Sequence, residues 1–233
     1  MKYLVISDIH GNAVALRKVL ENANYDGIIF LGDAVDYGPQ PSEVVDILKD
    51  LRPEIWLRGN HDEAVARRID CGCSPKTHAL SVLTREKISM KELSAEDRKF
   101  LGSRPIEVVM GKFSILCVHG SPSNPLYGYF NEENREYMIK MYGGPVEQNY
   151  VLVGHTHIPK IFRMGEWTVM NPGSVGQPRD GDPRASYAIL DTESMEFEIK
   201  RVKYNVDKVA SLLREKLGDK VEKLIKILKE GRV

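Results

Sequence analysis

The chain has 233 residues, with 33 Lys and Arg side chains, 33 Asp and Glu side chains and no net charge. This length fits one domain with a sizeable core, so we expect a single domain over residues 1–233. A balanced charge argues against a nucleic-acid polymer as partner, because such binding needs a basic face. No apolar run approaches the ~18 residues of a membrane span, so we expect no membrane contact.

The first third of the chain alternates apolar runs with helical patterns. Residues 4–6, 27–31 and 55–57 are apolar and predict strands, while apolar residues recur at helical spacing over 16–23 and 44–51. Apolar strands that alternate with helices are typical of a largely parallel sheet covered on both faces.

Residues 64–104 are polar and helical in pattern, and we interpret them as an insertion or cap over the strand ends. Short strands at close spacing follow, near 114–118, 150–153, 161–164, 167–170, 187–190 and 197–202. This spacing predicts a second sheet made mainly by hairpins.

Residues 207–230 carry apolar side chains at helical spacing and predict C-terminal amphipathic helices, broken at Gly218. Their apolar stripe allows two interpretations. The helices dock on the sheet of the same chain, or they form the interface of a homodimer. The sequence leaves both a monomer and a homodimer open.

Five of the six histidines lie in short blocks that follow apolar, strand-like runs. The blocks are Asp8-Ile9-His10, Gly32-Asp33, Gly59-Asn60-His61-Asp62, Val118-His119-Gly120 and Gly154-His155-Thr156-His157. Neutral imidazole and carboxylate oxygen bind first-row divalent metals, and ligands of an α/β sheet gather at the carboxyl ends of strands. Each block alone is also compatible with a simple turn, but together they predict a metal centre. His78 lies outside the blocks and is interpreted as a surface or cap residue.

The five blocks, in this order, resemble the motifs of the calcineurin-like metallophosphoesterase superfamily. The segment from Asn171 to Arg179 resembles a loop of its small single-domain prokaryotic members, which are phosphodiesterases and phosphatases. The resemblance runs from Asp8 to about Asp191 and leaves out the insertion and the C-terminal helices. It implies an α/β fold, a four-layer αββα sandwich of two mixed sheets with helices on the outer faces.

The resemblance also implies a dinuclear metal centre. Asp8, His10 and His157 would hold one divalent ion, with Asp33 as the bridge to a second ion held by Asn60, His119 and His155. A bridging carboxylate suits two ions about 3.5–4 Å apart. Four histidines, two aspartates, one asparagine and no thiolate favour transition metals, Mn first, with Ni, Fe, Co or Zn as alternatives.

By the same resemblance, His61 would be the general acid, oriented by Asp36, and a metal-bound hydroxide would attack phosphorus. Arg179 and Arg58 would neutralise the phosphoryl oxygens. Related protein Ser/Thr phosphatases and dinucleoside tetraphosphatases have an arginine at or next to the position of Tyr37. Tyrosine offers no charged, bidentate grip, so a phosphoprotein substrate is disfavoured.

We therefore expect a metal-dependent phosphoesterase that hydrolyses a small phosphodiester or nucleotide. A broad-specificity phosphomonoesterase is the alternative, and a non-catalytic metal-binding scaffold is a third hypothesis, disfavoured because every ligand position is filled. Selectivity is expected from residues 64–104, 122–130 and 177–184. The three cysteines are interpreted as structurally incidental. Without a disulfide framework or targeting segment, the expected location is the cytoplasm.

Overall fold

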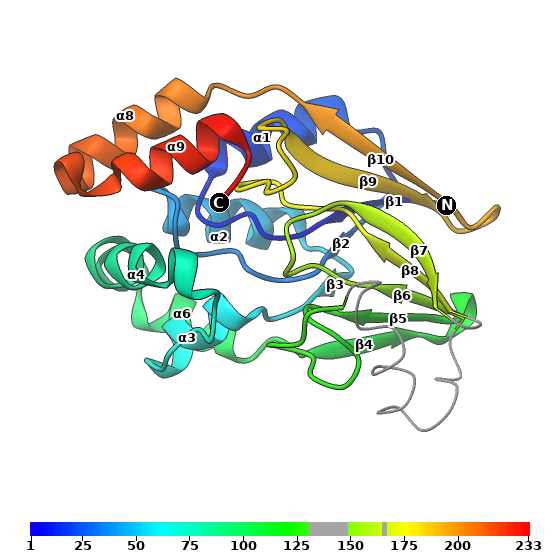
Figure 1. Cartoon of the computed structure of the whole chain (residues 1–233). Helices are drawn as coiled ribbons and strands as arrows, with labels where there is room; N and C mark the ends of the chain where they lie inside the picture. The colour runs from blue at the N-terminus through cyan, green and yellow to red at the C-terminus, as the bar shows by residue number, and fades with distance from the viewer. Residues whose placement is uncertain (131–148, 165–166) are drawn as a thin grey trace.

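Two five-stranded sheets lie face to face, with helices on the outer side of the first sheet and at one end of both (Figure 1). The computed structural model describes residues 1–130, 149–164 and 167–233. The first sheet has the order β10-β9-β1-β2-β3, formed by β1 (Lys2–Ile6), β2 (Gly27–Phe30), β3 (Ile55–Trp56), β9 (Ala185–Asp191) and β10 (Glu196–Val202). The second has the order β4-β5-β6-β8-β7, formed by β4 (Glu107–Met110), β5 (Ile115–Val118), β6 (Tyr150–Leu152), β7 (Lys160–Met164) and β8 (Trp167–Asn171).

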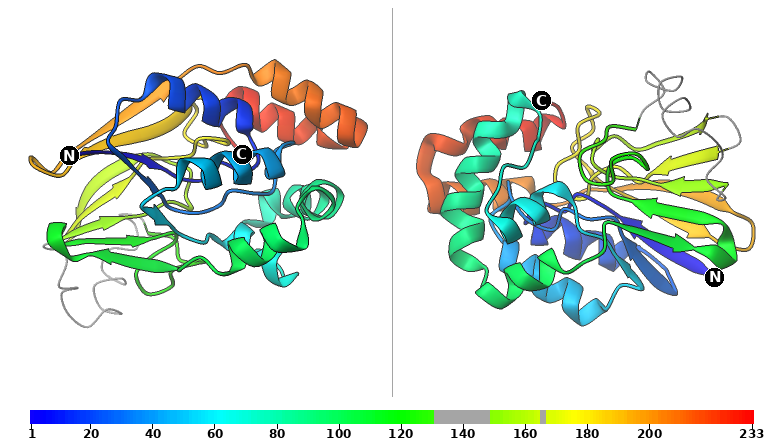
Figure 2. Two further views of the ribbon diagram at one scale, coloured as in Figure 1. Left: turned by 180° about the vertical axis from the view of Figure 1, so that it is seen from behind. Right: turned by 90° about the horizontal axis from the view of Figure 1, so that it is seen from below.

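The central strand β1 organises the first sheet. It pairs in parallel with β2 and antiparallel with β9, and β2 pairs in parallel with β3. Parallel neighbours need crossover connections, and α1 (Ala13–Asn22) and α2 (Pro41–Leu51) supply them. Both helices lie over the same face of this sheet (Figure 2). The predicted alternation of strands and helices is therefore confirmed here.

Side chains of β1 alternate between two cores, as the pleat of a strand requires. Leu4 and Ile6 face α1 and α2 in one buried cluster. Val5 faces the other way and packs with Cys117 and Met170 of the second sheet. The first sheet is thus buried on both faces, which explains why its strands read as continuous apolar runs.

The second sheet departs from the prediction in three ways. It includes β4, which the sequence analysis missed, because β4 is an edge strand with no fully buried residue. Its strands β5, β6 and β8 are parallel, so hairpins form only its edges. The hairpin of β9 and β10 joins the first sheet instead. Such pairings depend on contacts distant in sequence, which local patterns do not encode.

Two mixed sheets with helices are as the resemblance implies. The resemblance also implies helices on the outer face of the second sheet. The connection between β5 and β6, where such helices would be expected, includes residues 131–148, which lie outside the described residues.

The remaining helices gather beyond the carboxyl ends of the strands. They are α3 (Asn60–Arg67), α4 (Pro75–Thr84), the π-helical turn η1 (Arg85–Ser89), α5 (Met90–Glu92), α6 (Ala95–Gly102), α8 (Val206–Leu217) and α9 (Glu222–Glu230), with the short 3₁₀ turn η4 (Gly218–Val221). A second 3₁₀ turn, η2 (Gly111–Phe113), instead joins β4 to β5 at the amino end of β5. No helix of the described residues is both long and apolar enough to cross a membrane.

The C-terminal helices dock within the chain, although not on a sheet. Leu213 of α8 and Leu224 of α9 are fully buried in a cluster with Tyr37, Leu80 and Ile88. The partners come from the loop after β2 and from the 64–104 insertion, so the helices brace these two segments against each other. Gly218 marks the predicted break between α8 and α9, with φ of 61°. The apolar stripe is therefore covered without a second copy of the chain.

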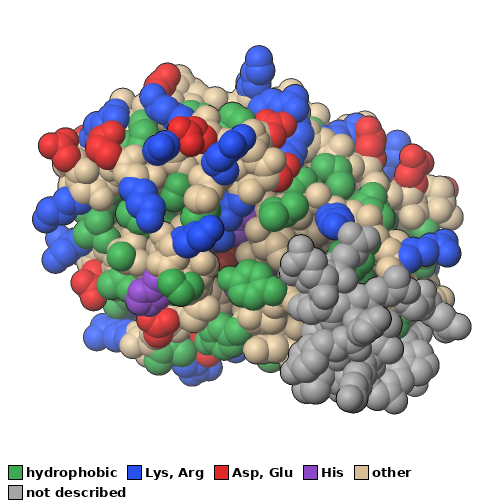
Figure 3. All heavy atoms as spheres, viewed as in Figure 1, with side chains coloured by type: hydrophobic (Ala, Val, Ile, Leu, Met, Phe, Trp, Pro, Cys, Tyr) green, Lys and Arg blue, Asp and Glu red, His purple; other side chains and the backbone are tan. Residues whose placement is uncertain are grey.

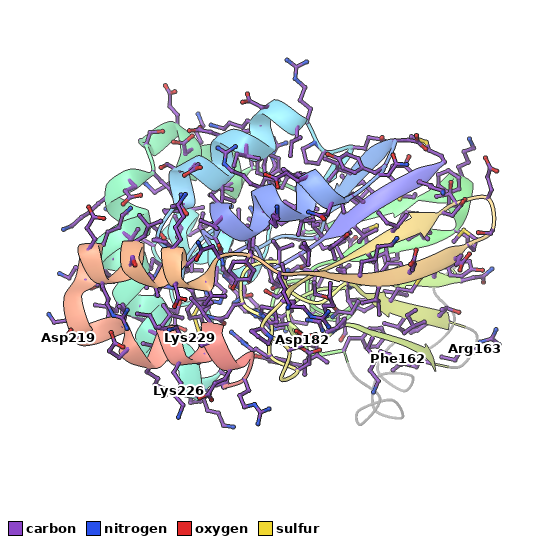
Figure 4. All side chains as sticks on the ribbon, turned by 90° about the horizontal axis from the view of Figure 1, so that it is seen from above. Phe162, Arg163, Asp182, Asp219, Lys226 and Lys229 are labelled. Carbon is purple, nitrogen blue, oxygen red and sulfur yellow. A yellow bond between two sulfur atoms is a disulfide. The ribbon has the colours of Figure 1, made fainter. Side chains whose placement is uncertain are left out.

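Replacing Leu224 by alanine should lower the free energy of unfolding by about 2–5 kcal/mol, because it leaves a cavity between α9 and the insertion. Chemical denaturation measures this loss. Lys226→Ala is the control, since Lys226 projects outward from α9 (Figure 4) and should change stability by less than about 0.5 kcal/mol. Equal stabilities of Leu224→Ala and the parent protein would contradict the docking.

Candidate metal centre

The predicted ligand blocks meet at one place, beyond the carboxyl ends of strands from both sheets. Asp8 and His10 follow β1, Asp33 follows β2, and Asn60 begins α3 after β3. From the second sheet, His119 follows β5, and His155 and His157 follow β6. All seven side chains are at least 96% buried. A hollow on this face shows histidine and acidic side chains at its floor, with Lys and Arg side chains around it (Figure 3).

Asp8, His10 and His157 form the first group of ligand atoms. The Nε2 atoms of His10 and His157 lie 3.0 Å apart. Oδ1 of Asp8 lies 3.9 Å from Nε2 of His10 and 3.4 Å from Nε2 of His157. This is the set that the resemblance assigns to one metal ion.

The hydrogen bonds of these rings show what the first group can hold. Nδ1 of His10 lies 2.9 Å from the Val35 carbonyl oxygen, and Nδ1 of His157 lies 2.6 Å from that of Gln177. A carbonyl only accepts, so both protons sit on Nδ1. Burial lowers the pKa of His10 to about 3 and the pKa of His157 well below its usual value, so both rings are neutral. Two lone pairs then face each other across 3.0 Å, an arrangement that a shared cation stabilises.

His119, His155 and Asn60 form the second group. Oδ1 of Asn60 lies 3.1 Å from Nε2 of His119 and 3.0 Å from Nδ1 of His155. The Asn60 amide nitrogen donates to the Cys71 carbonyl, which turns its oxygen toward the imidazoles. The His119 Nδ1 donates to the Leu31 carbonyl at 2.8 Å, so Nε2 presents a lone pair when the ring is neutral.

Asp33 lies between the two groups. Its Oδ2 is 3.8 Å from Nε2 of His10 and 3.3 Å from Nε2 of His119. Within the described residues, this oxygen and Oδ1 of Asp8 are buried without a hydrogen-bond partner. Buried acceptors left unpaired are costly, so the donor set fits two divalent ions that share Asp33.

Protons and metal ions compete for this centre. Although burial opposes the change, the Asp33 carboxylate raises the pKa of His119 to about 9. Burial also raises the pKa of Asp8 to about 6. In the absence of cations, a proton shared near Asp33 and His119 would reduce the repulsion, and metal binding would displace it.

The ligand loops have an unusual backbone. Seven residues of the site have φ between 48° and 66°, in the left-handed region that side chains rarely adopt: Asp8, His10, Asp33, Asp36, Tyr37, His155 and His157. Each such residue costs on the order of 1–3 kcal/mol unless its surroundings compensate. The turns aim successive side chains of one loop into a common volume.

Two side chains whose roles the sequence analysis missed hold these turns. Asp62 accepts hydrogen bonds from the backbone nitrogens of Asp33, Ala34 and Gly59, at 2.9, 2.9 and 3.1 Å. It thereby joins the Asp33 loop to the start of α3. Asp62 is the third residue of α3, after the N-cap Gly59, where an acidic side chain often caps a helix. This position in the sequence was the signal that could have revealed its role. Ser174 donates to the Asp8 carbonyl at 2.7 Å and fastens the Asp8 turn.

Glycine is required where the Asp33 loop meets α3. A Cβ on Gly59 would lie 2.1 Å from Oδ1 of Asp33, well inside van der Waals contact. The same Oδ1 accepts the backbone N–H of His61 at 2.8 Å. The backbone of the Gly59-Asn60-His61-Asp62 block thus packs directly against the Asp33 carboxylate.

His61 and Asp36 are brought together beside the ligands, as the resemblance implies. Nδ1 of His61 lies 3.1 Å from Oδ2 of Asp36. The His61 ring packs edge-on against the His10 ring, with centroids 5.0 Å apart. Asp36 is fully buried and His61 is 3% exposed. A carboxylate that accepts from Nδ1 leaves Nε2 as the atom that exchanges a proton with a ligand.

The two arginines differ in their surroundings. The Arg179 guanidinium lies 5.9 Å above the Tyr37 ring, which packs 4.9 Å from the His10 ring. After burial, Arg179 is the largest cause that lowers the pKa of His157, so its charge acts on the centre. Nε of Arg58 instead lies 3.0 Å from a carboxylate oxygen of Glu63. The structure brings Arg179 to the site and pairs Arg58 with an acid.

The cysteines correct the sequence analysis. Cys71 and Cys73 are joined by a disulfide, although their spacing was interpreted as incidental. The Cys71 carbonyl holds the Asn60 amide at 2.7 Å, so this loop contacts a candidate ligand. Cys117 is buried in the core between the sheets, as expected. His78 lies at the surface beside Asp70.

Comparisons with known proteins agree with this geometry. The chain is 36% identical over 246 residues to an uncharacterized protein of Methanocaldococcus jannaschii, a match that covers 93% of this chain and 96% of that protein. It is 29% identical over 207 residues to the phosphodiesterase YfcE of Escherichia coli, covering 83% and 89% of the two chains.

Solved structures and family models give the same result. The structure of a metallophosphoesterase from Sphaerobacter thermophilus, 34% identical, superposes with a TM-score of 0.83 over 99% of both chains. The model of the calcineurin-like phosphoesterase superfamily domain matches residues 1–195. This family is metal-dependent, and the Asp and His groups described above could hold metal ions. The chain belongs to the calcineurin-like phosphoesterase superfamily.

Proposed function

We propose that this protein is a phosphodiesterase that hydrolyses a small phosphodiester or nucleotide with a dinuclear metal centre. The observation that carries the proposal is the position of Oδ2 of Asp33 between two groups of possible ligand atoms, with His61 beside them. The name of the phosphodiesterase YfcE supports the reaction class. Asp8, His10 and His157 would hold one ion, and Asn60, His119 and His155 the other.

The chemistry follows from the donor set. Two bound divalent ions supply Lewis-acid charge for the phosphoryl oxygens and an activated hydroxide. Asp36 keeps a proton on Nδ1 of His61, so that Nε2 can donate its proton to the leaving oxygen. The buried Asp36 carboxylate also fixes the orientation of the His61 ring, which a general acid needs.

Arg179 would neutralise negative charge on the phosphate group of the substrate. It would take the part of the arginine that related enzymes have at or next to the position of Tyr37. Its guanidinium donates hydrogen bonds of 3.2 and 2.6 Å to the neutral amide oxygen of Gln177, which do not cancel its charge. The charge of Arg58 is neutralised by Glu63, so Arg58 would contribute less to the binding of an anionic substrate.

The surroundings favour a diester over a monoester. A phosphodiester carries one negative charge and a dianionic monoester carries two, and Arg179 provides one guanidinium beside the centre. The Tyr129 ring lies 4.4 Å from the His155 ring and is 40% exposed, which offers an aromatic wall for a base or aryl group. A broad phosphomonoesterase remains the second candidate. We propose a cytoplasmic location and a small-molecule substrate.

Asp33→Asn should lower the occupancy of both metal ions together, because one oxygen serves both groups. Metal content after dialysis against Mn²⁺ measures this, with the exposed Asp50→Asn as the control. The parent protein should lose activity with chelator and regain it with Mn²⁺ or Ni²⁺. Loss of a single ion in Asp33→Asn, or full recovery with Mg²⁺ alone, would contradict the assignment.

His61→Ala should keep near-normal metal content while kcat falls by about 10²–10⁴, the range for a lost general acid. The loss should shrink for substrates with good leaving groups, which need little protonation. His78→Ala is the matched control, since His78 lies at the surface. Parallel loss of metal and activity in His61→Ala would mean that His61 has a structural role.

A substrate panel tests the diesterase preference. Aryl diesters, cyclic nucleotides and dinucleoside polyphosphates should give a higher kcat/KM than the matching aryl monoester. A monoester that exceeds every diester by more than about tenfold, or 1.4 kcal/mol in transition-state stabilisation, overturns the preference. Metal binding without turnover of any ester would favour the scaffold hypothesis.

A further inference from the structure

Asp36 is held by side chains from a segment that supplies no metal ligand. Its Oδ1 accepts from the Ser89 hydroxyl at 3.1 Å. Its Oδ2 accepts from the Ser81 hydroxyl at 3.1 Å and faces Nη1 of Arg85 at 3.5 Å. All three residues lie in the 64–104 insertion, on α4 and η1, and all are buried. Both carboxylate oxygens are therefore fixed from outside the ligand loops.

The helical geometry of the insertion keeps these three residues on one face. Ser81, Arg85 and Ser89 are spaced four apart, and in an α-helix each such step drifts by about 40° around the axis. The stretch from Arg85 to Ser89 is a π-helical turn, whose wider i→i+5 turn offsets that drift. Wider turns of this kind occur often at functional sites.

The same segment holds the backbone around Asp36. Asp36 and Tyr37 have φ of 66° and 57°. The Tyr37 N–H donates to the Thr84 hydroxyl at 2.9 Å, and the Tyr37 hydroxyl donates to that of Thr77 at 3.1 Å. A turn in this conformation persists only when its surroundings determine it, and α4 provides these contacts.

We infer that Ser81, Arg85 and Ser89 are positioning residues for hydrolysis, which act through Asp36 on His61. The inference rests on the proposed function, in which His61 is the acid. The Ser81 hydroxyl also lies 3.2 Å from Nδ1 of His61, so it touches both members of the pair. Arg85 places a positive charge beside the fully buried carboxylate of Asp36. The 64–104 insertion thus positions the general acid, in addition to covering the strand ends.

Ser89→Ala and Arg85→Met in the full-length, Mn²⁺-loaded protein test this inference. Each removes one contact to Asp36. Ser103→Ala and Arg98→Met are matched controls, because their side chains bond to backbone carbonyls elsewhere in the insertion. The readouts are metal content, melting temperature, and kcat and KM for aryl phosphodiesters whose leaving phenols differ in acidity.

We expect kcat of both variants to fall by about tenfold for the poorest leaving group and by much less for p-nitrophenol. KM and metal content should stay near those of the parent protein. Arg85→Lys and Ser89→Thr, which keep a charge or a hydroxyl, should recover most of the rate. In a His61→Ala background, neither substitution should lower kcat further, because the group that they position is gone.

Several results would overturn the inference. One is an equal loss of kcat for all leaving groups, and another is a loss that persists in the His61→Ala background. If Ser89→Ala and Arg85→Met have the rates of the parent protein while His61→Ala shows a steep leaving-group dependence, the positioning role is rejected and His61 remains the acid. If His61→Ala shows no such dependence, the acid assignment itself fails. Should Arg85→Met not fold, Ser89→Ala decides, since it removes a single hydroxyl.

Discussion

Repulsion between buried acceptor atoms is the constraint on which this centre depends. Lone pairs on His10 and His157 face each other, and an oxygen of Asp33 lies near both groups of imidazoles without a donor. The rings of His10 and His157 are locked in this state by backbone carbonyls, so tautomer exchange does not relieve the contact. The protein therefore holds these acceptor atoms close together at a cost in folding free energy.

Well-packed elements around the centre compensate for the free-energy cost of this repulsion. The first sheet buries both its faces, against α1 and α2 and against the second sheet. Asp62 and Ser174 then tie the left-handed turns to these rigid elements. A further cluster, in which α8 and α9 pack on Tyr37 and Leu80, fixes the loop after β2. Residues far from the chemistry thus set where the ligands point.

The sequence predicted the parts of the site that residue type alone determines. Imidazoles and carboxylates after apolar runs marked the side chains that meet at the candidate centre, and family motifs paired His61 with Asp36. The missed parts have ordinary residue types. Ser81, Ser89 and Arg85 look like any polar helix face, and their role depends on a π-helical turn and on distant packing. The membership of β9 in the first sheet likewise follows from pairing with β1, and no local pattern specifies it.

That pairing has a consequence for how the protein is made. Tyr3 lies beside Leu190 in the first sheet, so β1 gains its antiparallel neighbour only after the chain has been synthesised as far as β9. His157, which shares a group with Asp8 and His10, also emerges late. Contacts so distant in sequence form only after the intervening chain exists, so the candidate ligand group of Asp8, His10 and His157 can assemble only once His157 has been synthesised.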